Sequence, residues 1–98
     1  MYYQQGDVLI KKVSQIKGDK LDHLILAEGE ATGHHHRVID GDAELYSHNG
    51  TLYLSVKSDE AVVTHEEHNA ITIKKGDYEI GIVQEYDHFA EEARNVAD

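Results

Sequence analysis

The chain has 98 residues and carries 19 acidic against 9 basic side chains, which gives a formal net charge of −10. This length suits one domain with one core, and the charge repels nucleic-acid phosphates and anionic lipids, so we expect neither nucleic acid nor a membrane as a partner. The absence of cysteine excludes disulfides, thiolate nucleophiles and cysteine-bound metals. We predict a cytoplasmic protein, because no apolar run approaches the roughly 20 residues that cross a bilayer and no signal peptide is recognisable.

Turn signals recur along the whole chain. Eight glycines, most of them next to Asp, Asn or Glu, and the absence of proline favour short strands joined by turns. This pattern predicts an all-β domain, either a small antiparallel barrel or a two-sheet sandwich. In chain order, the expected strands are 7–13, 24–27, 34–39, 43–47, 51–57, 61–65, 70–73 and 78–86.

The sharpest of these turn signals is Asn49-Gly50. Asn-Gly suits the type I′ turn, whose twist matches a two-stranded hairpin, so strand 43–47 is expected to pair with strand 51–57. Apolar and polar side chains alternate within the second strand, which places one face in the core. The side chains on that face are Leu52, Leu54 and Val56.

The periodicity changes near the C-terminus. Asp87 can cap a helix in which Phe89, Ala93 and Val96 recur at i, i+4 and i+7, a spacing that forms one apolar stripe. We therefore predict a single β-rich domain over residues 1–98, with a short terminal helix at 87–97.

Five of the eight histidines lie in two short runs about thirty residues apart. If the first run is a strand, His34 and His36 share one face about 6–7 Å apart, a spacing that lets both bind one ion, while His35 faces outward. A third ligand from the second run would complete a site with an open position for water or substrate. His65 is the first choice for that ligand and His68 the second.

The second run must be distinguished from a protease motif. His65 and His68 are spaced at i and i+3, whereas the zinc-protease motif has histidines at i and i+4 on a helix. Glu66 is available as a metal ligand, as a general base on metal-bound water, or only as a solvated charge. Thr64-x-x-Glu67 also fits a capping box, and in this alternative Glu67 caps a helical turn.

The histidine pattern resembles the two cupin motifs, which supply His-x-His, an acidic ligand and a further histidine from a small double-sheet barrel. The resemblance implies that His34 and His36 are ligands of the first motif and His65 the ligand of the second. The acidic ligand would be Asp40, which has the family's spacing, or Glu44, which has the family's acid type but lies further along the chain.

A second resemblance extends over most of the chain. A Gly-Asp-Val sequence near the start, a GHxHR motif at 33–37 and a THEEH motif at 64–68 are similar to those of short uncharacterised bacterial and phage-borne proteins. This resemblance implies no activity.

Three functions remain, and the sequence leaves open whether the protein is an enzyme. The first is a metal-binding β-barrel that acts on a small molecule, with Zn, Mn, Fe or Ni as the ion and Glu66 as the catalytic group. The second is a non-catalytic binding or assembly module, whose acidic, tyrosine-bearing surface meets a protein partner or another copy of the chain. The third is metal-free acid–base catalysis by a His–Glu pair. The metal ligands predicted for the first function are His34, His36, His65, His68 and Glu44.

Overall fold

A computed structural model describes residues 2–28 and 34–82 of the chain. The described part is all β, as the turn pattern predicted, and none of its segments is a helix long and apolar enough to span a bilayer. Its strands are β1 (Tyr2–Gln5), β2 (Val8–Lys12), β3 (Asp19–Lys20), β4 (Ile25–Glu28), β5 (His35–Asp40), β6 (Ala43–His48), β7 (Thr51–His65) and β8 (His68–Ile82).

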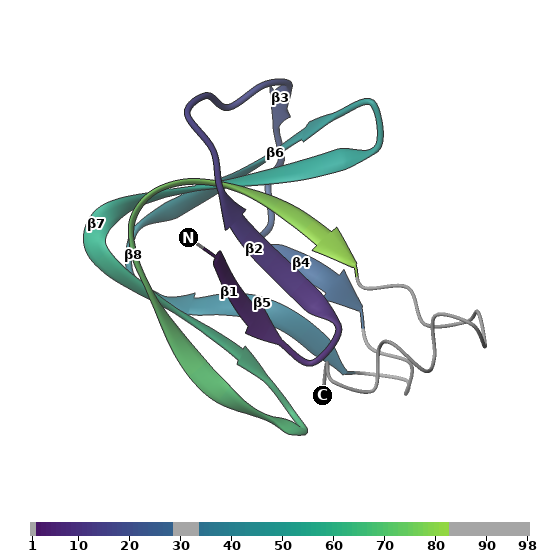
Figure 1. Ribbon diagram of the computed structural model, residues 1–98, viewed down its shortest axis with the longest axis vertical. Helices are drawn as coiled ribbons and strands as arrows, with labels where there is room; N and C mark the ends of the chain where they lie inside the picture. Colours follow the sequence, from purple (N-terminus) through teal and green to yellow (C-terminus); the bar gives the residue numbers. More distant parts are fainter. Residues whose placement is uncertain (1, 29–33, 83–98) are drawn as a thin grey trace.

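All of these strands belong to one antiparallel sheet, in which the order β1-β2-β8-β7-β5-β4 forms the main path (Figure 1). β7 is the central strand. One of its edges pairs with β8, while the other pairs first with β6 and then with β5. The sheet curls into a half-barrel, so its two ends, β1–β2 and β5–β4, come close to each other.

The curl is associated with an irregularity in the two longest strands. The β7–β8 register passes from Val56↔Gly76 directly to Glu60↔Lys74, so β7 has extra residues at this point. Extra residues of this kind bend a strand and increase its twist. The β7–β8 hairpin therefore bends across the molecule. The part beyond the bend ends at the turn from β7 to β8.

The concave side of the sheet holds the core. Period-two alternation directs apolar side chains from the strands inward, and their burial supplies most of the favourable free energy of folding. The buried apolar residues are Val8, Ile10, Leu26, Val38, Leu45, Leu54, Val56, Ala61, Val63, Ile73, Tyr78 and Ile80.

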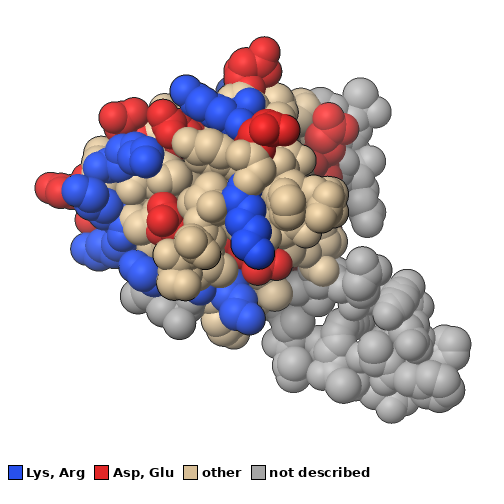
Figure 2. Space-filling model, turned by 90° about the horizontal axis from the view of Figure 1, so that it is seen from above, with Lys and Arg blue, Asp and Glu red and all other residues tan. Residues whose placement is uncertain are grey.

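Charged side chains of both signs are mixed on the surface. In the face seen in Figure 2, Lys and Arg lie among Asp and Glu. Exposed ion pairs include Lys74 with Glu60 at 3.3 Å and Lys20 with Glu44 at 3.5 Å. Such pairs typically contribute at most about 1 kcal/mol each, so the stability of the domain depends mainly on the core.

The predicted hairpin around Asn49-Gly50 is confirmed. β6 and β7 pair from Ala43↔Val56 to His48↔Thr51, and both turn residues have positive φ, 50° for Asn49 and 83° for Gly50. The predicted core face is confirmed as well, since Leu54 and Val56 are buried and Leu52 packs against the core.

Other strand boundaries were predicted less well. Segments 51–57 and 61–65 belong to one strand, and so do 70–73 and the start of 78–86. The first strand, β1, was not predicted. The predicted helix at 87–97 lies outside the described residues.

Candidate metal centre

The two histidine runs meet in space, at the end of the half-barrel where β7 turns into β8. β5 pairs with β7 through Arg37↔Thr64, and His65 pairs with His68 across the β7–β8 turn. These pairings bring the first histidine run next to the second. The centroid of the His65 ring lies 4.2 Å from that of His36, 4.7 Å from His68 and 5.6 Å from His34.

Three of the residues in this cluster bring potential metal-ligand atoms close together. One potential ligand atom from each of His34, His65 and Glu66 lies within 4.8 Å of the other two, and no other residues in the described ranges form such a group. His65 is buried, His34 is half-buried and Glu66 is exposed. The group is therefore accessible from one side and anchored in the protein on the other.

The Glu66 carboxylate is held by the neighbouring strand. Its Oε1 accepts a hydrogen bond of 2.9 Å from the backbone N–H of His35. This bond is the main reason why the pKa of Glu66 lies below its usual value. An ionised, fixed carboxylate is suited to binding a cation, whereas a general base near neutral pH requires a raised pKa.

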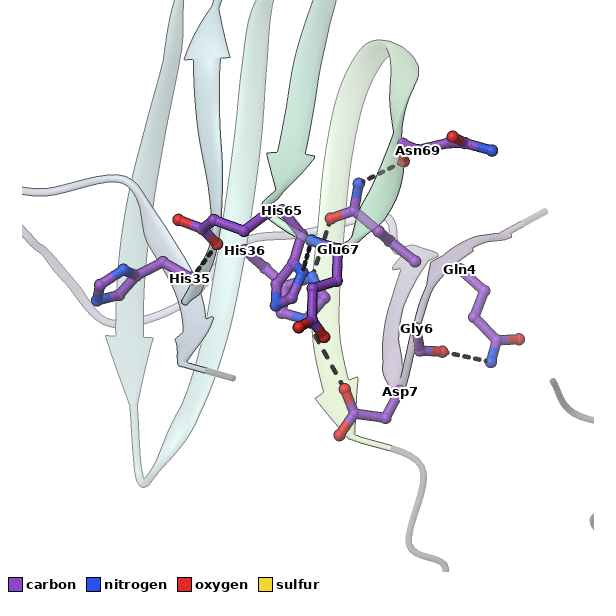
Figure 3. A network of polar contacts seen from close by, with 10 residues as sticks. Gln4, Gly6, Asp7, His35, His36, His65, Glu67 and Asn69 are labelled. Carbon is purple, nitrogen blue, oxygen red and sulfur yellow. Dashed lines mark hydrogen bonds and ion pairs between the residues drawn. The ribbon is translucent and has the colours of Figure 1, made fainter. Parts of the chain in front are cut away.

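His36 is the most enclosed histidine of the cluster, with only 2% of its surface exposed. Its Nδ1 lies 2.9 Å from Oε1 of Gln5. Its Nε2 lies 3.8 Å from Oδ1 of Asp7, a contact that is drawn as a dashed line in Figure 3. Burial first, and then the nearby His65, lower the pKa of His36 from 6.5 to about 4. The ring is therefore neutral at neutral pH.

His65 has a different hydrogen-bond partner. The backbone N–H of Glu67 donates a bond of 3.0 Å to its Nδ1 (Figure 3), while the Glu67 carboxylate lies 3.6 Å from Nδ1 of His34. The alternative in which Glu67 caps a helical turn is wrong. The two residues between His65 and His68 form the tight turn of a hairpin, and the chain continues as β8.

His68 is exposed and lies against the turn between β1 and β2. A Cβ atom placed on Gly6 would lie only 2.5 Å from Nε2 of His68, so the histidine ring occupies the space that a side chain at this turn would need. Gly6 also has a φ of 61°, which glycine adopts without cost.

Replacement of Gly6 by alanine should therefore displace the His68 ring. Gly50→Ala is the matched control, because Gly50 also has positive φ (83°) but no atom within 4 Å of an added Cβ. Both variants should lose about 1–2 kcal/mol of unfolding free energy from backbone strain, measured by urea denaturation. Only Gly6→Ala should change the ring resonances of His68 in NMR spectra, and unchanged resonances would contradict this packing.

Glu44, the predicted acidic ligand, is not brought to the histidines. It lies on β6 opposite Ser55, whereas His65 is at the far end of β7. Its carboxylate accepts a hydrogen bond of 2.6 Å from Tyr46, and this bond is the main cause of its lowered pKa. Asp40, the other candidate, is exposed at the end of β5, where its carboxylate accepts the N–H of Gly41.

Two residues near the cluster were missed by the sequence interpretation. Gln5 and Asp7 belong to the β1–β2 hairpin, and the curl of the sheet brings this hairpin against β5 and the β7–β8 turn. Gln5 is 2% exposed, which is rare for a glutamine. The sequence does not identify Gln5 as a buried residue, because Gly-Asp turns such as the one that follows it are common.

The chain belongs to the family described as a domain of unknown function, DUF8820, which matches residues 4–83. This range includes all of the histidines in the cluster as well as Gln5 and Asp7. Comparison with curated proteins and with solved structures gives no match.

Proposed function

We propose that this DUF8820 domain binds a divalent transition metal ion through His34, His65 and Glu66. The observation that carries the proposal is the approach of their three ligand atoms to within 4.8 Å of one another. Metal–nitrogen and metal–oxygen bonds of about 2.0–2.2 Å place ligand atoms of one ion roughly 3–4 Å apart, so small side-chain adjustments suffice.

The ligand types are suited to such an ion. Two imidazoles and a carboxylate form a three-ligand set that leaves a coordination position for water or a small molecule, an arrangement typical of catalytic rather than structural sites. The same set is compatible with Zn, Mn, Fe or Ni. In this proposal Glu66 is a ligand rather than the general base expected from the sequence, because its hydrogen bond from His35 favours the ionised form.

Metal binding at His65 would change the hydrogen bonding of its ring. Because Nδ1 of His65 accepts the N–H of Glu67, the neutral ring carries its proton on Nε2. An ion bound at Nδ1 would replace the Glu67 hydrogen bond, and an ion bound at Nε2 would require the ring proton to move to Nδ1, which breaks the same bond. In either case the N–H of Glu67 loses its acceptor on His65 when the ion binds.

The test is the metal content of protein purified without a histidine tag, followed by calorimetric titration with Zn²⁺, Mn²⁺, Fe²⁺ and Ni²⁺. We expect a near-stoichiometric ion and a higher melting temperature in its presence. His34→Ala and Glu66→Gln should each weaken binding by at least the roughly 10–100-fold that loss of an outer-shell partner costs.

His48→Ala is the matched control, because His48 is exposed and lies at the β6–β7 turn, away from the cluster. It should bind the ion as the wild type does. A protein without bound metal, whose melting temperature does not respond to any of the four ions, would rule out the proposal. That result would favour the binding or assembly module instead.

A further inference from the structure

We infer that Gln5 fixes the tautomer of His36 and that His36 Nε2 and Asp7 are thereby the protein ligands of a second cation position. This position adjoins the His34–His65–Glu66 group but is distinct from it, since His36 is not part of that group. The inference goes beyond the proposed function and adds two residues from the β1–β2 hairpin.

The orientation of the Gln5 amide follows from its partners. Its Nε2 donates hydrogen bonds to two backbone carbonyls, Val63 O at 3.1 Å and Asn69 O at 2.9 Å. An amide turned the other way would direct an oxygen at two other oxygens, which is unfavourable. Oε1 of Gln5 must therefore face Nδ1 of His36, 2.9 Å away.

This orientation determines where the proton of His36 lies. The Gln5 oxygen can only accept, so Nδ1 of the neutral ring must donate and carries the proton. Nε2 is then left with a lone pair. Both side chains are 2% exposed, so water does not compete for this hydrogen bond.

The lone pair of His36 Nε2 faces another acceptor. The Asp7 carboxylate oxygen lies 3.8 Å from it, and neither atom carries a proton that could join the two. Two acceptors this close to each other repel unless a cation or a donor such as water lies between them, and the negative charge of the carboxylate favours a cation. Because metal–nitrogen and metal–oxygen bonds are each about 2.0–2.2 Å long, one ion can reach both atoms with little movement.

The two ligands differ in solvent exposure, and we expect this position to be the weaker one. His36 is enclosed, whereas the Asp7 side chain is 49% exposed and can adjust to an incoming ion from the solvent side. A position with two protein ligands must keep several waters, so its affinity should be lower than that of the three-ligand group.

The first experiment measures the tautomers directly in metal-free wild type at pH 7.5, by long-range ¹H–¹⁵N NMR of the histidine rings. We expect His36 to carry its proton on Nδ1 and His65 to carry its proton on Nε2, the opposite tautomers. A His36 ring protonated on Nε2 would overturn the inference.

The second experiment is calorimetric titration with Zn²⁺ alone. The wild type should bind two equivalents, the second more weakly than the first. Gln5→Met should weaken the second step about 10-fold or more, the range typical for a lost partner of a ligating histidine. Asp7→Asn removes the carboxylate ligand itself and should weaken this step at least as much. Gln4→Met is the matched control, because Gln4 is the preceding residue on β1 and its side-chain amide donates to Gly6 O rather than to the histidine cluster.

The variants separate this inference from the proposed function. A single step that is lost in His34→Ala but unchanged in Asp7→Asn would overturn only the second position. A step that is lost in Asp7→Asn but retained in His34→Ala would instead contradict the three-residue site. If Gln5→Met does not fold, the Asp7→Asn variant, at an exposed position, and the tautomers measured in the wild type still test the inference.

Discussion

Replacement of Tyr78 by alanine should lower the free energy of unfolding by about 3–5 kcal/mol, the range for removal of a large buried aromatic side chain. Among the residues that the structure describes, Tyr78 is the largest fully buried side chain, and it lies on β8 as part of the core. Its ring meets that of Tyr3 edge-on, with centroids 5.9 Å apart, so it joins β8 to the strand that carries Gln5. Its loss leaves a cavity that the surrounding strands cannot fill.

Tyr78→Phe separates the contribution of the ring from that of the hydroxyl. The hydroxyl donates a hydrogen bond of 2.7 Å to the carbonyl of Lys74, and burial raises the pKa of Tyr78 to about 12, so the hydroxyl stays protonated. Loss of this bond should cost about 1 kcal/mol. Urea denaturation measures both variants, and Tyr2→Ala is the control because Tyr2 is 63% exposed. Equal losses in Tyr78→Ala and Tyr2→Ala would contradict the proposed core.

The faces of the strands could be predicted from sequence because the period of two is a local property of the backbone. Leu54 and Val56 point inward for this reason, and the Asn49-Gly50 turn fixes the register of its hairpin. The lengths of β7 and β8 could not be predicted. The polar segment 57–60 resembles a loop, but its backbone continues the strand through a bend.

The candidate site was predicted only in part, for a similar reason. Strand periodicity selected His34 and His36, but their approach to His65 depends on the pairing of β5 with β7, which no single-strand pattern determines. Glu44 was chosen by resemblance and lies near another part of β7. Gln5 reaches His36 only because the sheet curls, so tertiary structure alone reveals this contact.

Acid should destabilise the metal-free protein through His36. Its pKa is about 4 in the folded protein and about 6.5 in the unfolded chain, so protonation favours unfolding. The stabilising contribution is complete above pH 6.5 and is lost as the pH falls toward 4. The total loss from this group is about 3 kcal/mol, since each pKa unit corresponds to about 1.4 kcal/mol.

A comparison of variants isolates this effect from other titrations. The free energy of unfolding is measured by urea denaturation between pH 7.5 and 4.5, with EDTA present, for wild type, His36→Gln and the control His48→Gln. Protonation of carboxylates reduces the excess negative charge in all three proteins and largely cancels in the comparison. The wild type and His48→Gln should lose stability more steeply than His36→Gln, because glutamine cannot take up the proton. Parallel curves for all three would mean that His36 is not the buried neutral group on which both its tautomer and its role as a ligand depend.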